Sequence, residues 1–344
     1  MDSKEAGKKV TELRKSGRLD EALALGYEHL RTDPSSWALR GATAWAVWAK
    51  KIKGHDASKS RPADLVEAVE EVRKLNDFAL YGDISVYVTS VFEAANQLVA
   101  SNNAEFALAV LEEVDSSQLS TKKGEFEGRS SPSQLERWFN GMAKCLDKLE
   151  RLSELESLCE KALASGVFKS DAEKVWMRYR LAVARAERNP QSAIELFDQV
   201  FQQKKEWWVL GHKATCLRRL GRDEEALTTL KTALGGIRVA DIQMGVKILE
   251  ELVGLSDDPE MRSTIIQSLR AIRIEKGWPA KDTYEEWAAD AGCGPATGFA
   301  YVDAIKGLAD RDGFSSLRGP RRDKTGGTPR PRKKTVLVAG VSVR

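Results

Sequence analysis

The chain has 344 residues, of which 42% are hydrophobic and 31% charged, and its formal net charge is +3. This apolar content is enough for a buried core and excludes a wholly disordered chain, and the small net charge excludes a polycation. No apolar run approaches the roughly 18 residues of a membrane span, and the first residues form no apolar leader segment. We therefore expect a cytoplasmic protein, built either as two or three domains or as one extended repeat array.

A recurring spacing of small and apolar residues organises the first 235 residues. One such residue is followed by others after steps of twelve, four and three. Steps of four and three keep side chains on one helix face, and the step of twelve crosses a turn from a preceding helix. Small residues here predict antiparallel helices in close contact. The sets are Val10/Ala22/Gly26/His29, Ala95/Ala107/Leu111/Val114, Ala143/Leu155/Cys159/Ala162, Leu181/Ala193/Phe197/Val200 and Ala214/Ala226/Leu230/Ala233.

Residues 17–34, 189–201 and 221–234 resemble second helices of the tetratricopeptide repeat family, the first of them with a closing Pro34. The resemblance implies an all-α fold, a superhelical array of antiparallel helix pairs over residues 1–235. Equivalent second-helix positions are unevenly spaced, which indicates variable loops, with insertions at 54–62 and 115–133. Divergent HEAT-like helix pairs are an alternative for the middle of the chain.

Beyond residue 235 the repeat spacing weakens. Helical periodicity predicts helices near 238–254, 259–275, 280–291 and 296–310, and residues 236–311 are expected to cap the array. Pro259 and Pro279 stand at helix starts, where a missing N–H costs nothing.

The last 34 residues are basic, whereas the body of the chain is mildly acidic. From Arg311 onward there are ten Lys or Arg and two Asp or Glu, a net charge of +8 that leaves −5 for the rest. Residues 312–334 are rich in Pro, Gly and charge, and predict a disordered linker. Residues 335–344 are β-branched and strand-like, the pattern of a strand that pairs elsewhere or begins a further domain. Candidate nucleic-acid contacts in this tail are Arg318, Arg321, Arg322, Lys324, Arg330, Arg332, Lys333 and Lys334.

Residue types that carry catalysis are sparse. The three histidines are far apart in sequence, and no partner for acid–base chemistry is evident beside any of them. The four cysteines form no C-x-x-C pair, which argues against a zinc site. Cys159 is a member of the repeat pattern, Cys145 and Cys216 follow its small residues Ala143 and Ala214 by two, and all three are expected to be buried packing residues. The glycine-rich run at 292–298 lacks a Gly-Lys-Ser/Thr ending and indicates a helix stop. No enzymatic activity, cofactor or metal is expected.

In the resembled family the first helices line a concave groove that binds peptides. Carried onto this chain, that arrangement implies a mostly basic set of groove positions, suited to an acidic or carboxylate-bearing segment or to a phosphate backbone. The set does not match the two-Lys, two-Asn carboxylate clamp of the family. The candidate groove residues are Arg137, Asn140, Lys144, Lys148, Arg178, Arg185, Trp208, Arg218 and Arg219.

Two functions from different classes follow. The leading hypothesis is a protein–protein interaction scaffold that binds a partner segment in the groove. The alternative is a nucleic-acid-associated protein that uses the basic tail and groove. Residues 207–227 and 275–278 are similar to segments of repeat proteins carried in bacterial conflict or defence operons, in which the helical array can precede a small nucleic-acid-binding domain.

Overall fold

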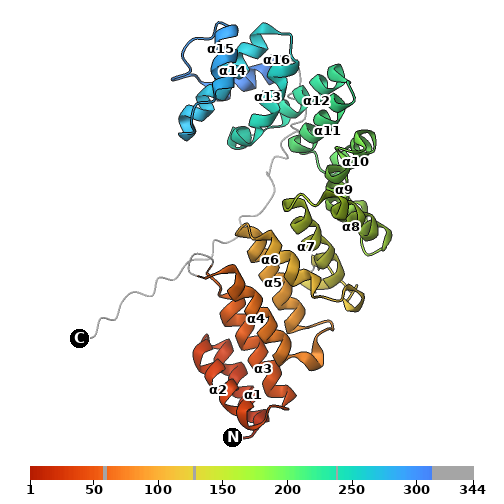
Figure 1. The fold of residues 1–344 in the computed structure, drawn as a ribbon, viewed down its shortest axis with the longest axis vertical. Helices are drawn as coiled ribbons and strands as arrows, with labels where there is room; N and C mark the ends of the chain where they lie inside the picture. The colour runs from red at the N-terminus through yellow and green to blue at the C-terminus, as the bar shows by residue number, and fades with distance from the viewer. Residues whose placement is uncertain (57–59, 127–128, 238, 312–344) are drawn as a thin grey trace, which may run out of the picture.

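The computed structural model of the chain describes residues 1–56, 60–126, 129–237 and 239–311. Over these residues the structure is an all-α array of antiparallel helix pairs that curves into an open arc (Figure 1). The expected fold class is confirmed for the helical body. The expected disordered linker 312–334, the strand-like segment 335–344 and the basic tail residues lie outside the described residues.

The first twelve α-helices form six consecutive pairs, and each helix packs on the next one in the chain. The odd-numbered helices from α1 to α9 also pack on one another, so the first helices of these pairs share one side of the arc. The bounds are α1 Ser3–Lys15, α2 Leu19–Thr32, α3 Trp37–Val47, α4 Pro62–Leu75, α5 Val86–Ala100, α6 Ala104–Glu112, α7 Gln134–Lys148, α8 Leu152–Ala164, α9 Asp171–Arg185, α10 Pro190–Gln203, α11 Trp207–Arg219 and α12 Asp223–Gly236.

The residues of the recurring sequence spacing are the ones that pack between the helices of these pairs. Every member of the five sets is buried apart from His29, which is partly exposed at the end of α2. The largest buried members are Phe197, Leu111, Leu155 and Leu230. Small residues let the two backbones of a pair approach, and the Leu or Phe one turn later fills the layer beside them.

The turn within a pair repeats almost identically along the chain. Its central residue has a left-handed backbone at Gly17, Asn102, Glu150 and Gly221, with φ between +54° and +79°. The next residue donates its N–H to a leucine carbonyl of the preceding helix, as in Arg222 N to Leu217 O at 3.0 Å. This geometry satisfies carbonyl groups at the end of the first helix.

The two expected insertions are where the array departs from plain helix pairs. Beyond α3 the chain continues as a π-helix, Trp48–Lys53, and α4 begins only at Pro62. The second insertion contains a 3-10 helix, Ser116–Gln118, and an antiparallel hairpin of β1 (Gly124–Phe126) and β2 (Arg129–Ser131), with Gly124 opposite Ser131. The Nζ of Lys123, just before β1, lies 3.4 Å from Glu136 Oε1 on α7 and 2.6 Å from Glu173 Oε1 on α9.

Further short and long helices follow the six pairs. A 3-10 helix, Val239–Gly245, replaces the first part of the helix predicted at 238–254, and the later elements are α13 Val246–Leu255, α14 Pro259–Lys276, α15 Asp282–Asp290 and α16 Tyr301–Arg311. The helix predicted at 296–310 starts late because Gly298 adopts φ +77° within a preceding turn. Helix α16 packs against both α14 and α12.

The buried side chains form two apolar cores that meet at α9 and α10. Met177 and Leu181 on α9 belong to the first core, whereas Val175 and Ala182 on the same helix belong to the second. Leu196 on α10 packs against both cores.

Among the described helices, none combines the length and the apolar content that crossing a membrane would need.

Candidate partner-binding groove

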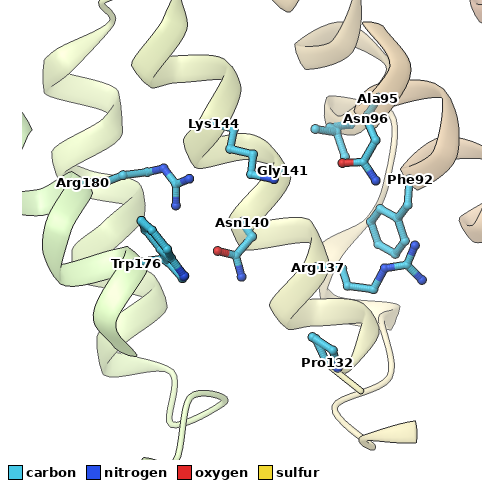
Figure 2. A pocket seen from close by; sticks show the side chains of 11 residues that line it. Phe92, Ala95, Asn96, Pro132, Arg137, Asn140, Gly141, Lys144, Trp176 and Arg180 are labelled. Carbon is cyan, nitrogen blue, oxygen red and sulfur yellow. The ribbon is translucent and has the colours of Figure 1, made fainter. Parts of the chain in front are cut away.

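A pocket of about 560 Å³ opens on the side of the arc formed by the first helices α5, α7 and α9 (Figure 2). That volume lies in the range of ordinary ligand sites. Its walls are aromatic, amide and cationic, and none of the residues that line it is acidic. They are Phe92, Ala95, Asn96, Leu111, Pro132, Arg137, Asn140, Gly141, Lys144, Trp176 and Arg180.

Helix α7 supplies the central wall of the pocket. A capping box fixes its start, with Glu136 N donating to Ser133 Oγ at 3.2 Å and Ser133 N donating to Glu136 Oε2 at 2.6 Å. From there Arg137, Gly141 and Lys144 follow at steps of four and three and so share one helix face. The side chain of Leu111 lies directly beneath Gly141, where an added Cβ would stand only 3.1 Å from Leu111 Cδ1.

Two cations of this wall, Arg137 and Lys144, form no ion pair with any described residue, and both keep exposed surface. The guanidinium of Arg137 stands over the ring of Phe92, 4.5 Å from its centroid. Although Arg137 keeps surface exposed to solvent, desolvation by the surrounding protein lowers its pKa. The negative charge of Glu93 acts in the opposite direction and raises this pKa. Its contact with an aromatic face rather than a carboxylate leaves its hydrogen-bond donors available to a ligand.

Arg180 on α9 is the most unusual residue of the pocket, because it is only 7% exposed and still carries a charge. Its Nε and Nη1 atoms have no hydrogen-bond partner among the described residues. Burial lowers the pKa of Arg180, and the nearby Asp147 opposes this effect without forming an ion pair. The pKa of Asp147 is itself raised by burial. Figure 2 shows the guanidinium pointing from α9 toward α7, across the pocket.

A row of aromatic side chains continues from this pocket onto α11. We name it the aromatic ridge and define it as Trp176, Tyr179, Trp208 and His212. The rings of Trp176 and Trp208 stack with centroids 6.0 Å apart and planes 9° from parallel. Tyr179 meets Trp208 edge to face at 4.9 Å, and its hydroxyl lies 3.1 Å from His212 Nε2. Trp176 remains 43% exposed, so the ridge presents apolar surface to a ligand.

The aromatic ridge also determines the surroundings of His212, where burial lowers its pKa. Its ring stacks on Phe197 at 5.7 Å, and although one edge is exposed, desolvation lowers its pKa, with the charge of Lys247 adding to the effect. The imidazole of His212 therefore packs among the rings of Phe197 and Tyr179.

Of the predicted groove residues, the structure brings Arg137, Asn140 and Lys144 together in the pocket and places Trp208 in the aromatic ridge. Three further predicted groove residues lie on first helices but outside the pocket. Lys148 Nζ is 3.4 Å from Asn102 Oδ1, Arg219 binds the end of α9 through Ala186 O at 2.8 Å, and Arg218 is exposed on α11.

The expected placement of Arg178 and Arg185 in the groove is corrected by their contacts. Arg185 binds Glu156 at 2.8 Å and also Glu160, so its guanidinium lies against the second helix α8. Arg178 is seven residues away, on the same face of α9, and pairs with Asp171 at 2.8 Å. The face of α9 that reaches the pocket carries Trp176 and Arg180 instead.

Sequence reasoning missed Arg180 and did not assign Trp176 to the groove. The only signal available was their spacing of four residues, which places them on one helix face. That spacing says nothing about which face of α9 meets the groove.

The described residues contain no group of three or more His, Cys, Asp or Glu side chains arranged to hold a metal ion. Cys145, Cys159 and Cys216 are buried packing residues, and burial raises the pKa of their thiols to about 11, about 12 and about 11. These thiols fill the core as small apolar groups.

No protein-family model matches the chain, and no curated protein matches it. Among solved structures, the chain is similar to a tetratricopeptide repeat protein from Parabacteroides merdae ATCC 43184, with a TM-score of 0.38 and 13% identity over 90% of this chain and 97% of that chain. The array of antiparallel helix pairs is established by the chain's own helix contacts and repeated packing positions.

Proposed function

We propose that the protein is an interaction scaffold that binds a segment of another protein along the first-helix side of α7, α9 and α11. The observation that carries the proposal is the exposed stack of Trp176 on Trp208, which leads into a pocket lined by cations. Partly exposed aromatic residues beside arginine are the composition of binding hot spots. Charge complementarity makes an acidic segment with at least one large apolar side chain the expected partner. The proposal includes no catalytic step and no cofactor.

A site-specific photocrosslinker tests this proposal in the full-length chain. Benzoylphenylalanine replaces Trp176 in one variant and Thr228, exposed on the second helix α12, in a matched control. After irradiation in native lysate, we expect a discrete crosslinked protein with the Trp176 variant only, and we expect an acidic peptide competitor to suppress it. Equal crosslinking from both positions would contradict the groove assignment.

The nucleic-acid alternative is separated by treating the same lysate with nuclease before irradiation. The tail residues on which that alternative depends lie outside the described residues, and so it stays a prediction from sequence. Loss of the crosslinked species on nuclease treatment would favour the alternative, whereas a nuclease-resistant species supports a protein partner.

A further inference from the structure

We propose that Arg180, together with Lys144 and Arg137, forms a receptor for a phosphate group inside the pocket. This inference rests on the proposed function and deepens it, because it names the chemical group by which the partner segment is anchored. The phosphate would bind in the cavity of about 560 Å³ that the three cations line, Arg180 from α9 and Lys144 and Arg137 from α7, with Arg137 on the side of Phe92 (Figure 2).

The first argument is that Arg180 is buried and lacks hydrogen-bond partners. An arginine residue that is only 7% exposed and lacks partners at Nε and Nη1 is costly, because burial removes the hydration that stabilises its charge. An anion bound at Nε would supply one of the missing partners. A planar guanidinium binds an oxyanion through two parallel N–H···O bonds, and its Nε with Nη2 presents that pair of donors, as in the pairing of Arg222 with Glu225.

The second argument is the balance of charge. Three cations line the pocket, no lining residue is acidic, and the nearest described carboxylates act on them only at a distance. A carboxylate would neutralise one of the three. A phosphate monoester carries about −1.5 to −2 charges near neutral pH and matches the site more closely. The amides of Asn96 and Asn140, which also line the pocket, can donate to further phosphate oxygens.

The third argument concerns the group that carries the phosphate. Trp176 and Phe92 form apolar walls beside the cations, and the aromatic ridge continues from Trp176 onto α11. A phosphorylated side chain within a peptide can place its phosphate on Arg180 while the flanking residues pack on these rings. A free phosphorylated small molecule shares the same chemistry.

The test is calorimetric titration of the full-length protein at constant ionic strength. The probes are inorganic phosphate, O-phosphotyrosine, a short phosphotyrosine peptide with its unphosphorylated form, a single-stranded oligonucleotide, and acetate as a monoanion. We expect the phosphorylated probes to bind and acetate and the unphosphorylated peptide to bind much more weakly. A peptide that binds more tightly than O-phosphotyrosine indicates a phosphorylated segment, and equal affinities indicate a small molecule. Both results support the phosphate receptor.

The variants are Arg180→Met, Lys144→Met and the control Lys148→Met, which lies one turn further along α7 and outside the pocket. Arg180→Met should weaken phosphate binding about tenfold to a hundredfold, as expected for lost hydrogen bonds to a charged group. Lys148→Met should leave it unchanged. Methionine fills a similar volume without a buried charge, so the variant should fold, as circular dichroism checks. Lys144 is exposed, so Lys144→Met tests the receptor even if Arg180→Met does not fold.

Phosphorylated probes that bind no better than acetate would overturn the inference, as would equal losses in Arg180→Met and Lys148→Met. Tighter binding of a single-stranded oligonucleotide than of the phosphopeptide would overturn it in favour of a nucleic-acid backbone. A crosslinked partner at position 176 without phosphate binding would reject the receptor and leave the proposed function standing. Phosphate binding without a crosslinked protein would support the phosphate receptor and reject the proposed scaffold function.

Discussion

Gly26 on α2 faces Thr43 on α3 so closely that a Cβ added at Gly26 would lie 2.5 Å from Thr43 Oγ1 and 3.0 Å from Thr43 Cγ2. Thr43 is fully buried and donates its hydroxyl to Leu39 O at 2.8 Å, so it has little room to move. The second helix of one pair and the first helix of the next therefore meet across a glycine.

This contact predicts opposite effects for two glycine-to-alanine substitutions. Gly26→Ala should lower the free energy of unfolding, because overpacking costs about 1–3 kcal/mol and exceeds the helix-propensity gain of about 1 kcal/mol. Gly307→Ala, exposed in the middle of α16 with no atom near the new Cβ, should be neutral or stabilising. Urea denaturation of both variants measures the difference. A stabilising Gly26→Ala would show that the two helices can separate without cost.

The repeat spacing makes a second prediction at its small positions. Ala193 and Ala226 are fully buried between paired helices, so Ala193→Leu or Ala226→Leu should cost about 1–3 kcal/mol of stability through overpacking. The matched control is Ala172→Leu on the exposed start of α9, which should change stability little. Thermal melting followed by circular dichroism compares the three. If the buried and exposed substitutions had equal effects, the packing role of the spacing would be wrong.

The ion pair between Lys123 and Glu173 predicts a dependence of stability on pH. The hydrogen bond from Lys123, with the backbone N–H groups of Lys169 and Ser170, lowers the pKa of Glu173 to about 2 from a usual value of 4.5. Because the folded-state pKa is depressed, this stabilisation is present above about pH 4.5 and is lost as pH falls toward 2.

The measurement is the difference in urea midpoint between wild type and Glu173→Gln, taken at about pH 6 and about pH 3. We expect wild type to be the more stable at the higher pH and the difference to shrink at the lower pH. Glu195→Gln, on the exposed face of α10, serves as the control for a charge removed elsewhere. A difference that stays constant with pH would contradict the role of Glu173.

The thiols provide a fourth prediction. Iodoacetamide at about pH 8 should modify the native protein first at Cys293, which is partly exposed, since the thiolate is the reacting form. Cys145, Cys159 and Cys216 are buried with raised pKa values and should react only after denaturation, when all four thiols become available. Mass spectrometry of the adducts locates each site. Rapid native modification of Cys159 would show that α8 opens easily.

The helix pairs could be predicted from sequence because their packing depends on spacing along a single chain segment. The steps of twelve, four and three place Ala193 and Phe197 on the helix face that packs against the paired helix, and this placement needs no information about other helices. The groove could be predicted only in part. Arg137 and Lys144 line the pocket, but Arg178 and Arg185 do not, because the rotation of α9 about its own axis is set by its contacts with the neighbouring helices. One residue of helix turns a side chain by about 100°, so a small error in this rotation exchanges one face for another.

The two apolar cores meet at α9, the helix that also carries Trp176 and Arg180. A segment bound from α7 to α11 would therefore lie across the joint between the two halves of the arc. Part of its binding free energy would be the free energy of holding those halves at one angle. By linkage, if a bound segment favoured one angle between the halves by some factor, a second ligand that favoured the same angle would raise the affinity of the groove for that segment, and the segment would raise the affinity for the second ligand by the same factor.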